Sequence, residues 1–177
     1  MKPEEGKIMV KFRTPLRCNC NCVYCGLYNG ISEEESRRSF DDVIGMLKFL
    51  DKRHVSGIKI IGGEPLLEFE RLLSLIKACD RKGISFILTT NAVGMDSSKV
   101  EKLVNAGLKD IAISLDSPDR ATHNRIRRNG KAFDSAVSAI HHISSRYPSV
   151  HVQVNTCLLY TSPSPRDLST SRMPSSA

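Results

Sequence analysis

Short apolar runs alternate with amphipathic stretches along residues 1–156 of the chain. Between the runs, apolar residues recur at the i, i+3, i+4, i+7 spacing of a helix that buries one face. The runs themselves are rich in isoleucine, valine and phenylalanine and fit buried strands: 8–12, 58–61, 86–88, 111–115 and 150–154. Strands that alternate with helices in this order predict an α/β fold with a parallel sheet.

Four helices are expected between these strands. Their apolar stripes fall within 43–50, 69–79, 100–104 and 133–143. We expect Ser39 to cap the first helix, and Asp96 and Gly107 to begin and close the third. Cys79 continues the stripe of the second helix, so we expect it to be a small core residue rather than a ligand.

The last apolar run alternates valine with polar residues, which predicts a strand with one polar face. Both an edge strand that faces solvent and a polar barrel lumen explain this pattern. In parallel βα folds, ligands bind beyond the carboxyl ends of the strands. Polar or glycine-rich segments follow the first four strands, and we expect them to converge on one rim: 17–25, 62–65, 89–91 and 114–117.

Residues 157–177 lose this periodicity and are rich in serine, threonine and proline. The string CLLYTSPSPRD, which begins at Cys157, resembles the codon-by-codon translation of a transposase-based sequencing adaptor. The string SRMPSSA resembles the flow-cell primer that follows such an adaptor. We therefore expect 157–177 to be a non-native, disordered tail and 1–156 to be an incomplete domain whose last strand runs into the tail. The alternative is a natural disordered tail.

The net charge is +7 in 177 residues, with basic residues interleaved with acidic ones. This pattern favours a solvated surface over a nucleic-acid footprint, although basic side chains in a pocket would suit an anionic substrate. The chain has no apolar run long enough to cross a bilayer, and its first residues lack the features of a signal or transit peptide. We expect a cytoplasmic protein that binds neither membranes nor nucleic acid.

Four of the six cysteines lie within RCNCNCVYC, residues 17–25. Cys18, Cys22 and Cys25 have the spacing C-x3-C-x2-C, and three thiolates from one loop can hold three irons of a cubane cluster while the fourth iron stays open. With Cys20, the loop could instead form a closed site of four thiolates for zinc or a cluster, in a non-enzymatic binding module. The short C-x-C-x-C bridges fit a tetrahedral ion poorly and favour the site of three thiolates.

This loop resembles that of the radical S-adenosylmethionine (radical SAM) superfamily, whose hallmark is C-x3-C-x2-C after the first barrel strand. IIGGEPLL, residues 60–67, is similar to the family's GGEP element. The resemblance covers nearly all of 8–156 and implies a partial (β/α)6 TIM-barrel-like core, truncated after about the fifth strand. It implies that Cys18, Cys22 and Cys25 hold a [4Fe-4S] cluster, and it leaves Cys20 out, at a position the family usually fills with an apolar residue.

The resemblance also implies the contacts to SAM. The matching residues are Tyr24, Gly62, Gly63, Glu64, Pro65, Thr90 and Ser114. In the family the aromatic residue lies against the adenine, and the backbone of GGEP contacts the amino group of the methionine moiety. Each match has a structural alternative in the residues alone: loop packing for Tyr24, a first helical position for Pro65, and turn or cap hydroxyls for Thr90 and Ser114.

The resemblance implies an enzyme in which a reduced cluster cleaves SAM to methionine and a 5′-deoxyadenosyl radical. That radical abstracts hydrogen from a substrate in the barrel. A reductant such as flavodoxin or ferredoxin would supply the electron, and the protein would orient the substrate and exclude water. We expect the 177-residue chain itself to be poorly active, since it lacks the last part of the barrel.

The segment 116–140 is similar to two branches of the family. One is the molybdenum cofactor biosynthesis protein A type, which acts on GTP, and the other is the SPASM type of peptide-modifying and sulfatase-maturating enzymes. HNRIR, residues 123–127, favours the second branch slightly, so a small-molecule and a peptide substrate both stay open. His123 and Arg125 are candidates for substrate or cofactor contact, but a solvated loop is the favoured interpretation.

Overall fold

The computed structural model describes residues 7–13, 16–25 and 30–157. All candidate site residues named above lie within these ranges. The predicted tail lies outside the described residues, except for Cys157.

Five strands and five α-helices follow one another in the described residues. Their bounds are β1 (Ile8–Arg13), α1 (Glu33–Met46), β2 (Val55–Ile61), α2 (Phe69–Arg81), β3 (Ser85–Thr90), α3 (Ser97–Asn105), β4 (Asp110–Ser114), α4 (Arg120–Arg127), α5 (Ala132–Arg146) and β5 (His151–Asn155). Two short 3-10 helices, η1 (Leu47–Phe49) and η2 (Pro65–Glu68), adjoin α1 and α2. The five predicted strands and four predicted helices are confirmed, and α4 is an addition.

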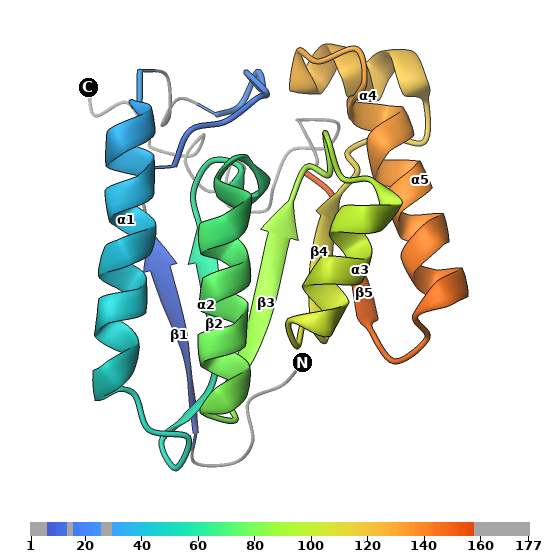
Figure 1. Ribbon diagram of the computed structural model, residues 1–177. Helices are drawn as coiled ribbons and strands as arrows, with labels where there is room; N and C mark the ends of the chain where they lie inside the picture. The colour runs from blue at the N-terminus through green and yellow to red at the C-terminus, as the bar shows by residue number, and fades with distance from the viewer. Residues whose placement is uncertain (1–6, 14–15, 26–29, 158–177) are drawn as a thin grey trace, which may run out of the picture.

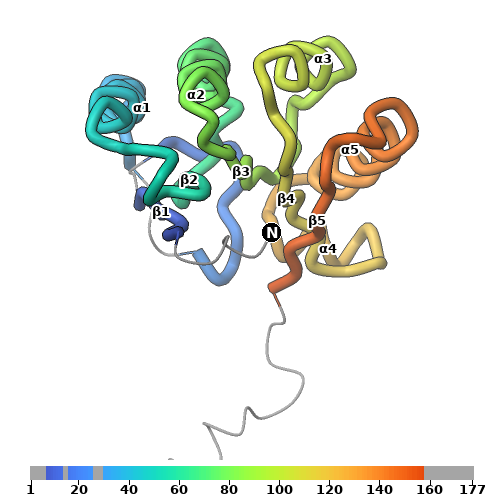
Figure 2. The backbone as a smooth tube through the Cα atoms, turned by 90° about the horizontal axis from the view of Figure 1, so that it is seen from below, coloured from blue at the N-terminus to red at the C-terminus, as the bar shows by residue number. Residues whose placement is uncertain are grey.

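The strands form one parallel sheet in the order β1-β2-β3-β4-β5. Figures 1 and 2 show α1, α2, α3 and α5 side by side on a single face of that sheet. A doubly wound sheet would reverse its strand order and carry helices on both faces, whereas consecutive order with all crossovers on one side is how a barrel is built. The predicted TIM-barrel-like α/β fold is therefore confirmed.

The face of the sheet under the helices forms the hydrophobic core. Fully buried side chains from alternate strand positions, such as Ile58, Leu88 and Ile111, pack against apolar stripes of the helices. Cys79 of α2 is completely buried in this core, as predicted. The other residues of each strand point to the helix-free, inner face. The polar positions of β5 lie on this face, where His151 Nδ1 is 3.3 Å from Asp110 Oδ1 of β4.

The amino end of α1 differs from the prediction. Ser39 does not cap this helix: it lies inside α1 and donates its hydroxyl to the Glu35 carbonyl at 2.8 Å. The helix begins at Glu33, and Ser32 forms a capping box with Glu35, in which each side chain satisfies the backbone N–H of the other residue. The sequence carries this S-x-x-E signal, which outweighs a lone serine next to the apolar stripe.

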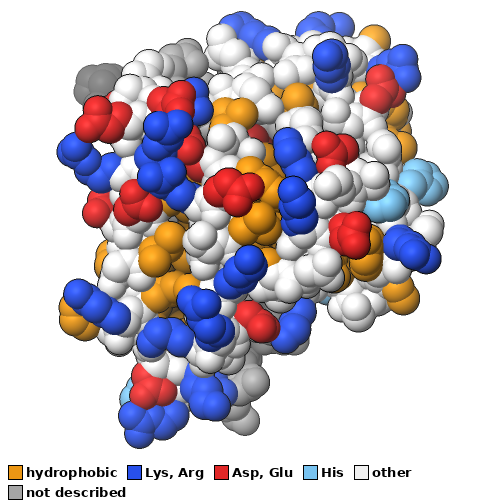
Figure 3. All heavy atoms as spheres, in the orientation of Figure 1, with side chains coloured by type: hydrophobic (Ala, Val, Ile, Leu, Met, Phe, Trp, Pro, Cys, Tyr) orange, Lys and Arg blue, Asp and Glu red, His pale blue; other side chains and the backbone are white. Residues whose placement is uncertain are grey.

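The helix-covered surface carries basic and acidic side chains intermingled rather than a basic stripe (Figure 3). Several of them form exposed ion pairs, among them Arg38 with Glu34 at 3.2 Å and Arg71 with Asp41 at 3.1 Å. Within the described ranges, no helix is both long and apolar enough to cross a bilayer.

Candidate functional site

The four predicted rim segments meet at one pocket beyond the carboxyl ends of the strands. Its volume is about 160 Å³. The lining residues are Cys18, Cys22, Tyr24, Cys25, Gly62, Gly63, Glu64, Thr89, Thr90, Asn91, Ser114 and Arg127. Every residue predicted to bind the cluster or SAM therefore lines this pocket, except Pro65, which is buried at the start of η2.

The turn after β2 holds the entry of the cysteine loop. Glu64 N donates to the Arg17 carbonyl at 2.7 Å. A Cβ atom on Gly63 would lie 2.1 Å from the Leu16 carbonyl oxygen and 2.3 Å from that of Arg17. Only glycine fits where two backbone segments pass this closely. Gly63 of the GGEP element is therefore required for docking of the cysteine loop, whatever ligand the pocket receives.

The other side of the cysteine loop is held by the carboxyl end of α4. Val23 N donates to the Ile126 carbonyl at 2.9 Å, and Asn21 N donates to the Arg127 carbonyl at 3.3 Å. The last carbonyls of a helix have no partner within the helix, so the loop amides satisfy them and the helix end fixes the loop. Helix α4 thus belongs to the site, although its sequence predicted a loop.

The interpretation of His123 as part of a solvated loop is wrong, because this residue is only 1% exposed. The His123 ring accepts a hydrogen bond at Nδ1 from Asp116 N at 3.0 Å. Arg125 is exposed, as expected. The helix escaped prediction because its buried face consists largely of His123 and Arg127 rather than apolar residues. Its start carried one signal, since Asp119 caps it by accepting from Thr122 N at 2.7 Å.

Two of the predicted ligands have N–H donors at their sulfur atoms. Cys18 Sγ accepts from Cys20 N at 3.5 Å and from Asn91 Nδ2 at 3.8 Å, and Cys22 Sγ accepts from Arg127 Nη1 at 3.7 Å. The pKa of Cys22 is lowered to about 6 by a hydrogen bond from the Cys20 thiol and by the Arg127 charge. A hydrogen bond from Cys20 also lowers the pKa of Cys18. Thiolates are the metal-binding form of cysteine, so this environment suits metal ligation.

Cys20 differs from its neighbours. Its hydrogen bonds to Cys18 and Cys22 raise the pKa of its thiol, and it does not line the pocket. The pKa of the Cys20 thiol is thus shifted in the opposite direction to those of Cys18 and Cys22 next to it. In the described part of the chain, no three cysteine, histidine or acidic side chains converge on one point as around a single metal ion. What Cys18, Cys22 and Cys25 share is one pocket wall, which is compatible with three ligands at separate corners of a cluster.

Glu64 is the centre of a buried network on the β2–β3 side of the pocket, and it is only 1% exposed. Its Oε1 accepts from Thr90 Oγ1 at 2.7 Å and from Leu66 N at 3.1 Å, while Oε2 accepts from Asn91 N at 2.7 Å. Burial raises the pKa of Glu64 to about 7 despite these donors. Thr90 Oγ1 accepts in turn from Ala92 N at 2.9 Å. Both side chains therefore brace the turns around them.

The neighbouring hydroxyl of Thr89 is in the opposite situation. Thr89 Oγ1 is buried without a hydrogen-bond partner, and the residue lines both the rim pocket and a second hollow beneath it. Of these two threonines, only Thr90 was predicted to contact SAM. The missed signal is strand parity: adjacent residues of β3 point to opposite faces, and Leu88 and Thr90 share one face.

The hollow beneath the rim has a volume of about 250 Å³. It shares Gly62, Gly63 and Thr89 with the rim pocket, and Lys59 and Asn155 also line it. Lys11 of β1 is the register partner of Lys59 of β2, so both belong to the same layer of the inner face. The inner face next to the site is thus basic.

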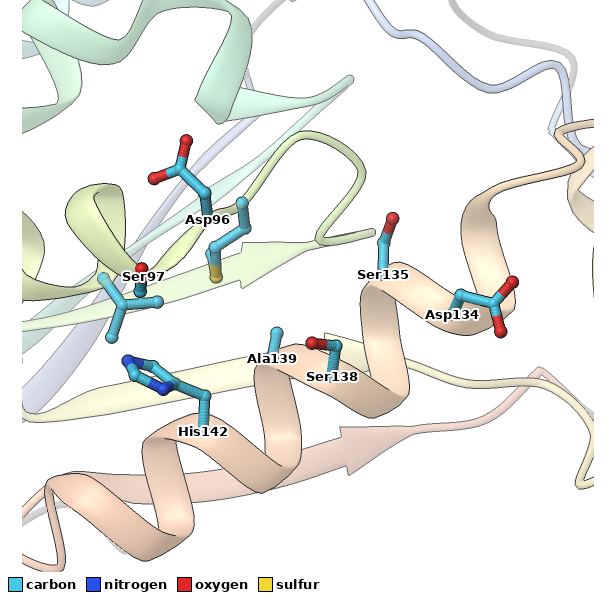
Figure 4. A pocket seen from close by; sticks show the side chains of 9 residues that line it. Asp96, Ser97, Asp134, Ser135, Ser138, Ala139 and His142 are labelled. Atoms are coloured by element: carbon cyan, nitrogen blue, oxygen red, sulfur yellow. The ribbon is translucent and has the colours of Figure 1, made fainter.

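A larger hollow of about 520 Å³ lies between α3 and α5 on the outer, helix-covered side (Figure 4). The His142 ring points from α5 toward Ser97 at the start of α3, and Ser135 and Ser138 line the same groove. This hollow contains none of the predicted site residues. The smaller rim pocket is the candidate site because the thiols gather there.

The family description "Radical SAM superfamily" matches residues 13–163 of the sequence. The chain belongs to this superfamily. Radical SAM enzymes use a [4Fe-4S] cluster and SAM, so the chain is part of an enzyme family with these cofactors. The predicted family and its cofactors are confirmed.

Curated relatives of this radical SAM chain are cyclases by name. It is 34% identical over 140 residues to the GTP 3′,8-cyclase of Listeria monocytogenes serotype 4b, covering 74% of this chain and 40% of the relative. It is 32% identical over 134 residues to the probable GTP 3′,8-cyclase of Methanococcus maripaludis, covering 73% and 44%. The chain therefore spans less than half the length of these relatives.

Solved structures share the fold of the radical SAM chain. The crystal structure of Streptococcus suis SuiB bound to precursor peptide SuiA has a TM-score of 0.69 at 22% identity and covers 88% of this chain and 34% of that one. Methylornithine synthase (PylB) has a TM-score of 0.60 at 16% identity, covering 85% and 45%. At these identities the likeness concerns the fold alone.

Proposed function

We propose that this chain forms the cluster- and SAM-binding part of a radical SAM enzyme, with Cys18, Cys22 and Cys25 as the ligands of three irons of a [4Fe-4S] cluster. The observation that carries the proposal is that all three thiols line one pocket together with the GGEP turn and the ends of β3 and β4. When bound, the cluster and SAM would supply one-electron cleavage of SAM and a 5′-deoxyadenosyl radical that takes hydrogen from the substrate. The donor of that electron is proposed to be a flavodoxin or ferredoxin.

The residues predicted to bind SAM divide into two groups in this proposal. Gly62 and Gly63 offer backbone at the pocket wall, and Tyr24 and Ser114 offer a ring and a hydroxyl there. The remaining three residues hold this wall in place: Glu64 and Thr90 through their mutual hydrogen bond, and Pro65 by starting η2. Tyr24 OH donates to Asp116 Oδ2 at 3.3 Å, which fixes the ring at the pocket edge.

We propose a small anionic substrate such as GTP rather than a peptide. Lys59 lines the hollow beneath the rim, and its register partner Lys11 adds a second positive charge to the same layer. Positive charge that lines a hollow attracts phosphates. The relatives named GTP 3′,8-cyclase support the same choice. The segment HNRIR, which favoured a peptide substrate, lies in α4 and holds the cysteine loop instead.

The test is the formation of 5′-deoxyadenosine from SAM when dithionite reduces the anaerobically reconstituted enzyme. Because the chain spans less than half of its relatives, the full-length gene is used. We expect product in the parent protein, stimulation by GTP, and no product in Cys22→Ala. A parent protein that shows no iron-sulfur absorbance and binds one zinc ion tightly would instead establish the non-enzymatic zinc module.

A further inference from the structure

A buried ion pair lies directly behind the cysteine loop. Arg127 Nε donates to Asp116 Oδ2 at 2.6 Å, and Arg127 Nη2 donates to Asp116 Oδ1 at 3.0 Å. The side chains are 11% and 0% exposed, respectively. A two-point contact of this kind fixes the plane of the guanidinium, which a lysine ammonium cannot reproduce.

The remaining edge of the guanidinium faces the cysteine loop. Arg127 Nη1 lies 3.7 Å from Cys22 Sγ, and Arg127 Cζ lies 5.5 Å from the centre of the Tyr24 ring. The carboxylate is itself held, because Tyr24 OH donates to Oδ2 at 3.3 Å. The carboxylate, the ring and the sulfur thus fix the cation from three directions.

The partial negative charge at the carboxyl end of α4 makes a cation important beside Cys22. The carboxyl end of α4 contacts the cysteine loop through the carbonyls of Ile126 and Arg127. That end carries a partial negative charge, which would repel a thiolate or an anionic cluster beside it. Arg127, in the last turn of α4, places its guanidinium Nη1 3.7 Å from Cys22 Sγ, so a positive charge as well as the helix end lies next to this sulfur.

We propose that Arg127, oriented by Asp116, is a positioning residue that holds a positive charge against Cys22 and thereby raises the reduction potential of the cluster. This inference rests on the proposed function, since it requires Cys22 to be a ligand. One-electron reduction by an external reductant adds one negative charge to the cluster and breaks no bond. A cation held in a site of low dielectric stabilises the reduced form more than the oxidised form, so it favours uptake of the electron.

The test is a redox titration of the reconstituted 177-residue chain with dithionite and mediators, followed by electron paramagnetic resonance of the reduced cluster. We expect Arg127→Met to lower the ratio of reduced to oxidised cluster at a fixed potential by about tenfold, which is about 59 mV for one electron. Arg127→Lys keeps the charge but cannot form the two-point contact with Asp116 that orients it. We expect this variant to lower the ratio of reduced to oxidised cluster roughly threefold. Arg128→Met is the matched control: it removes an exposed charge next in the sequence, and we expect no change.

Arg127→Met leaves Asp116 buried without its partner, which destabilises the fold. The double variant Arg127→Met/Asp116→Asn removes both charges and still lacks the donor at Cys22, so we expect its potential to fall as well. Iron and sulfide analysis of each variant shows how much cluster it holds. An unchanged potential in the double variant or in Arg127→Lys, at full cluster content, would overturn the proposal. A parent chain that takes up no cluster would instead contradict the proposed function.

Discussion

The two sides of the rim pocket differ in what their polar groups contact: on one side they bind one another, and on the other they face the pocket. On the β2–β3 side, the Glu64 carboxylate, the Thr90 hydroxyl and the Asn91 backbone satisfy one another and are buried. On the cysteine-loop side, the sulfur atoms of Cys18 and Cys22 receive long N–H contacts and face the pocket. The first side is therefore a support, whose loss should appear in stability. The second is a binding surface, whose loss should appear in ligand uptake.

The largest effect on stability is expected from Glu64→Ala. The substitution leaves the Thr90 hydroxyl and the N–H groups of Leu66 and Asn91 buried without an acceptor, which costs about 3–5 kcal/mol in the free energy of unfolding. The measurement is urea unfolding of the metal-free chain. Cys22→Ser is the comparison from the other side, and we expect it to cost about 1 kcal/mol or less. Equal losses in the two variants would contradict the division into support and binding surface.

The pH dependence of stability should also come from the support side. Burial raises the folded-state pKa of Glu64 to about 7 from its ordinary value of 4.5. A raised carboxyl pKa stabilises the fold below the unfolded-state value, and this stability is lost as the pH rises through the folded-state value. The change between pH 4.5 and pH 8 amounts to about 3 kcal/mol.

Glu64→Gln is the control for this pH dependence, since it keeps the shape of the side chain without the titration. Subtracting its unfolding free energy from that of the parent at each pH removes the contribution of the cysteines. That contribution has the opposite sign, because the pKa of Cys22 is lowered. We expect the free energy of unfolding of the parent, minus that of Glu64→Gln, to fall as the pH rises from 5 to 8. A constant difference would show that Glu64 titrates normally.

The two adjacent threonines of β3 offer the smallest and most local comparison. Thr90→Val removes the donor to Glu64 and the acceptor for Ala92 N, and we expect it to cost about 1–3 kcal/mol. Thr89→Val removes a hydroxyl that has no partner, so we expect a change within about 0.5 kcal/mol. Both are measured by urea unfolding. A larger loss in Thr89→Val would contradict the assignment of Thr90 to the support.

The order of elements and the location of the site were predictable from the sequence because they depend on local periodicity and on one rule of parallel sheets. The apolar runs predicted the strands, and the ends of those strands predicted which segments share the pocket. The spacing of Cys18, Cys22 and Cys25 predicted the thiols that line it.

Other features depend on contacts between segments far apart in the sequence. Helix α4 buries His123 and Arg127 against the cysteine loop, so it has no apolar stripe to detect. The need for glycine at position 63 arises from the backbone of Leu16 and Arg17, which no local pattern reveals. The different roles of Thr89 and Thr90 follow from strand parity, which could have been read from the sequence once β3 was placed.

The most direct test of the cysteine assignment is iron and sulfide analysis after anaerobic reconstitution of the parent chain, Cys20→Ser and Cys22→Ser. We expect about four iron and about four sulfide per chain in the parent and in Cys20→Ser, and loss of the intact cluster in Cys22→Ser. A parent chain that binds a single zinc ion instead, with equal loss of metal in the Cys20 and Cys22 variants, would contradict a cluster held by Cys18, Cys22 and Cys25.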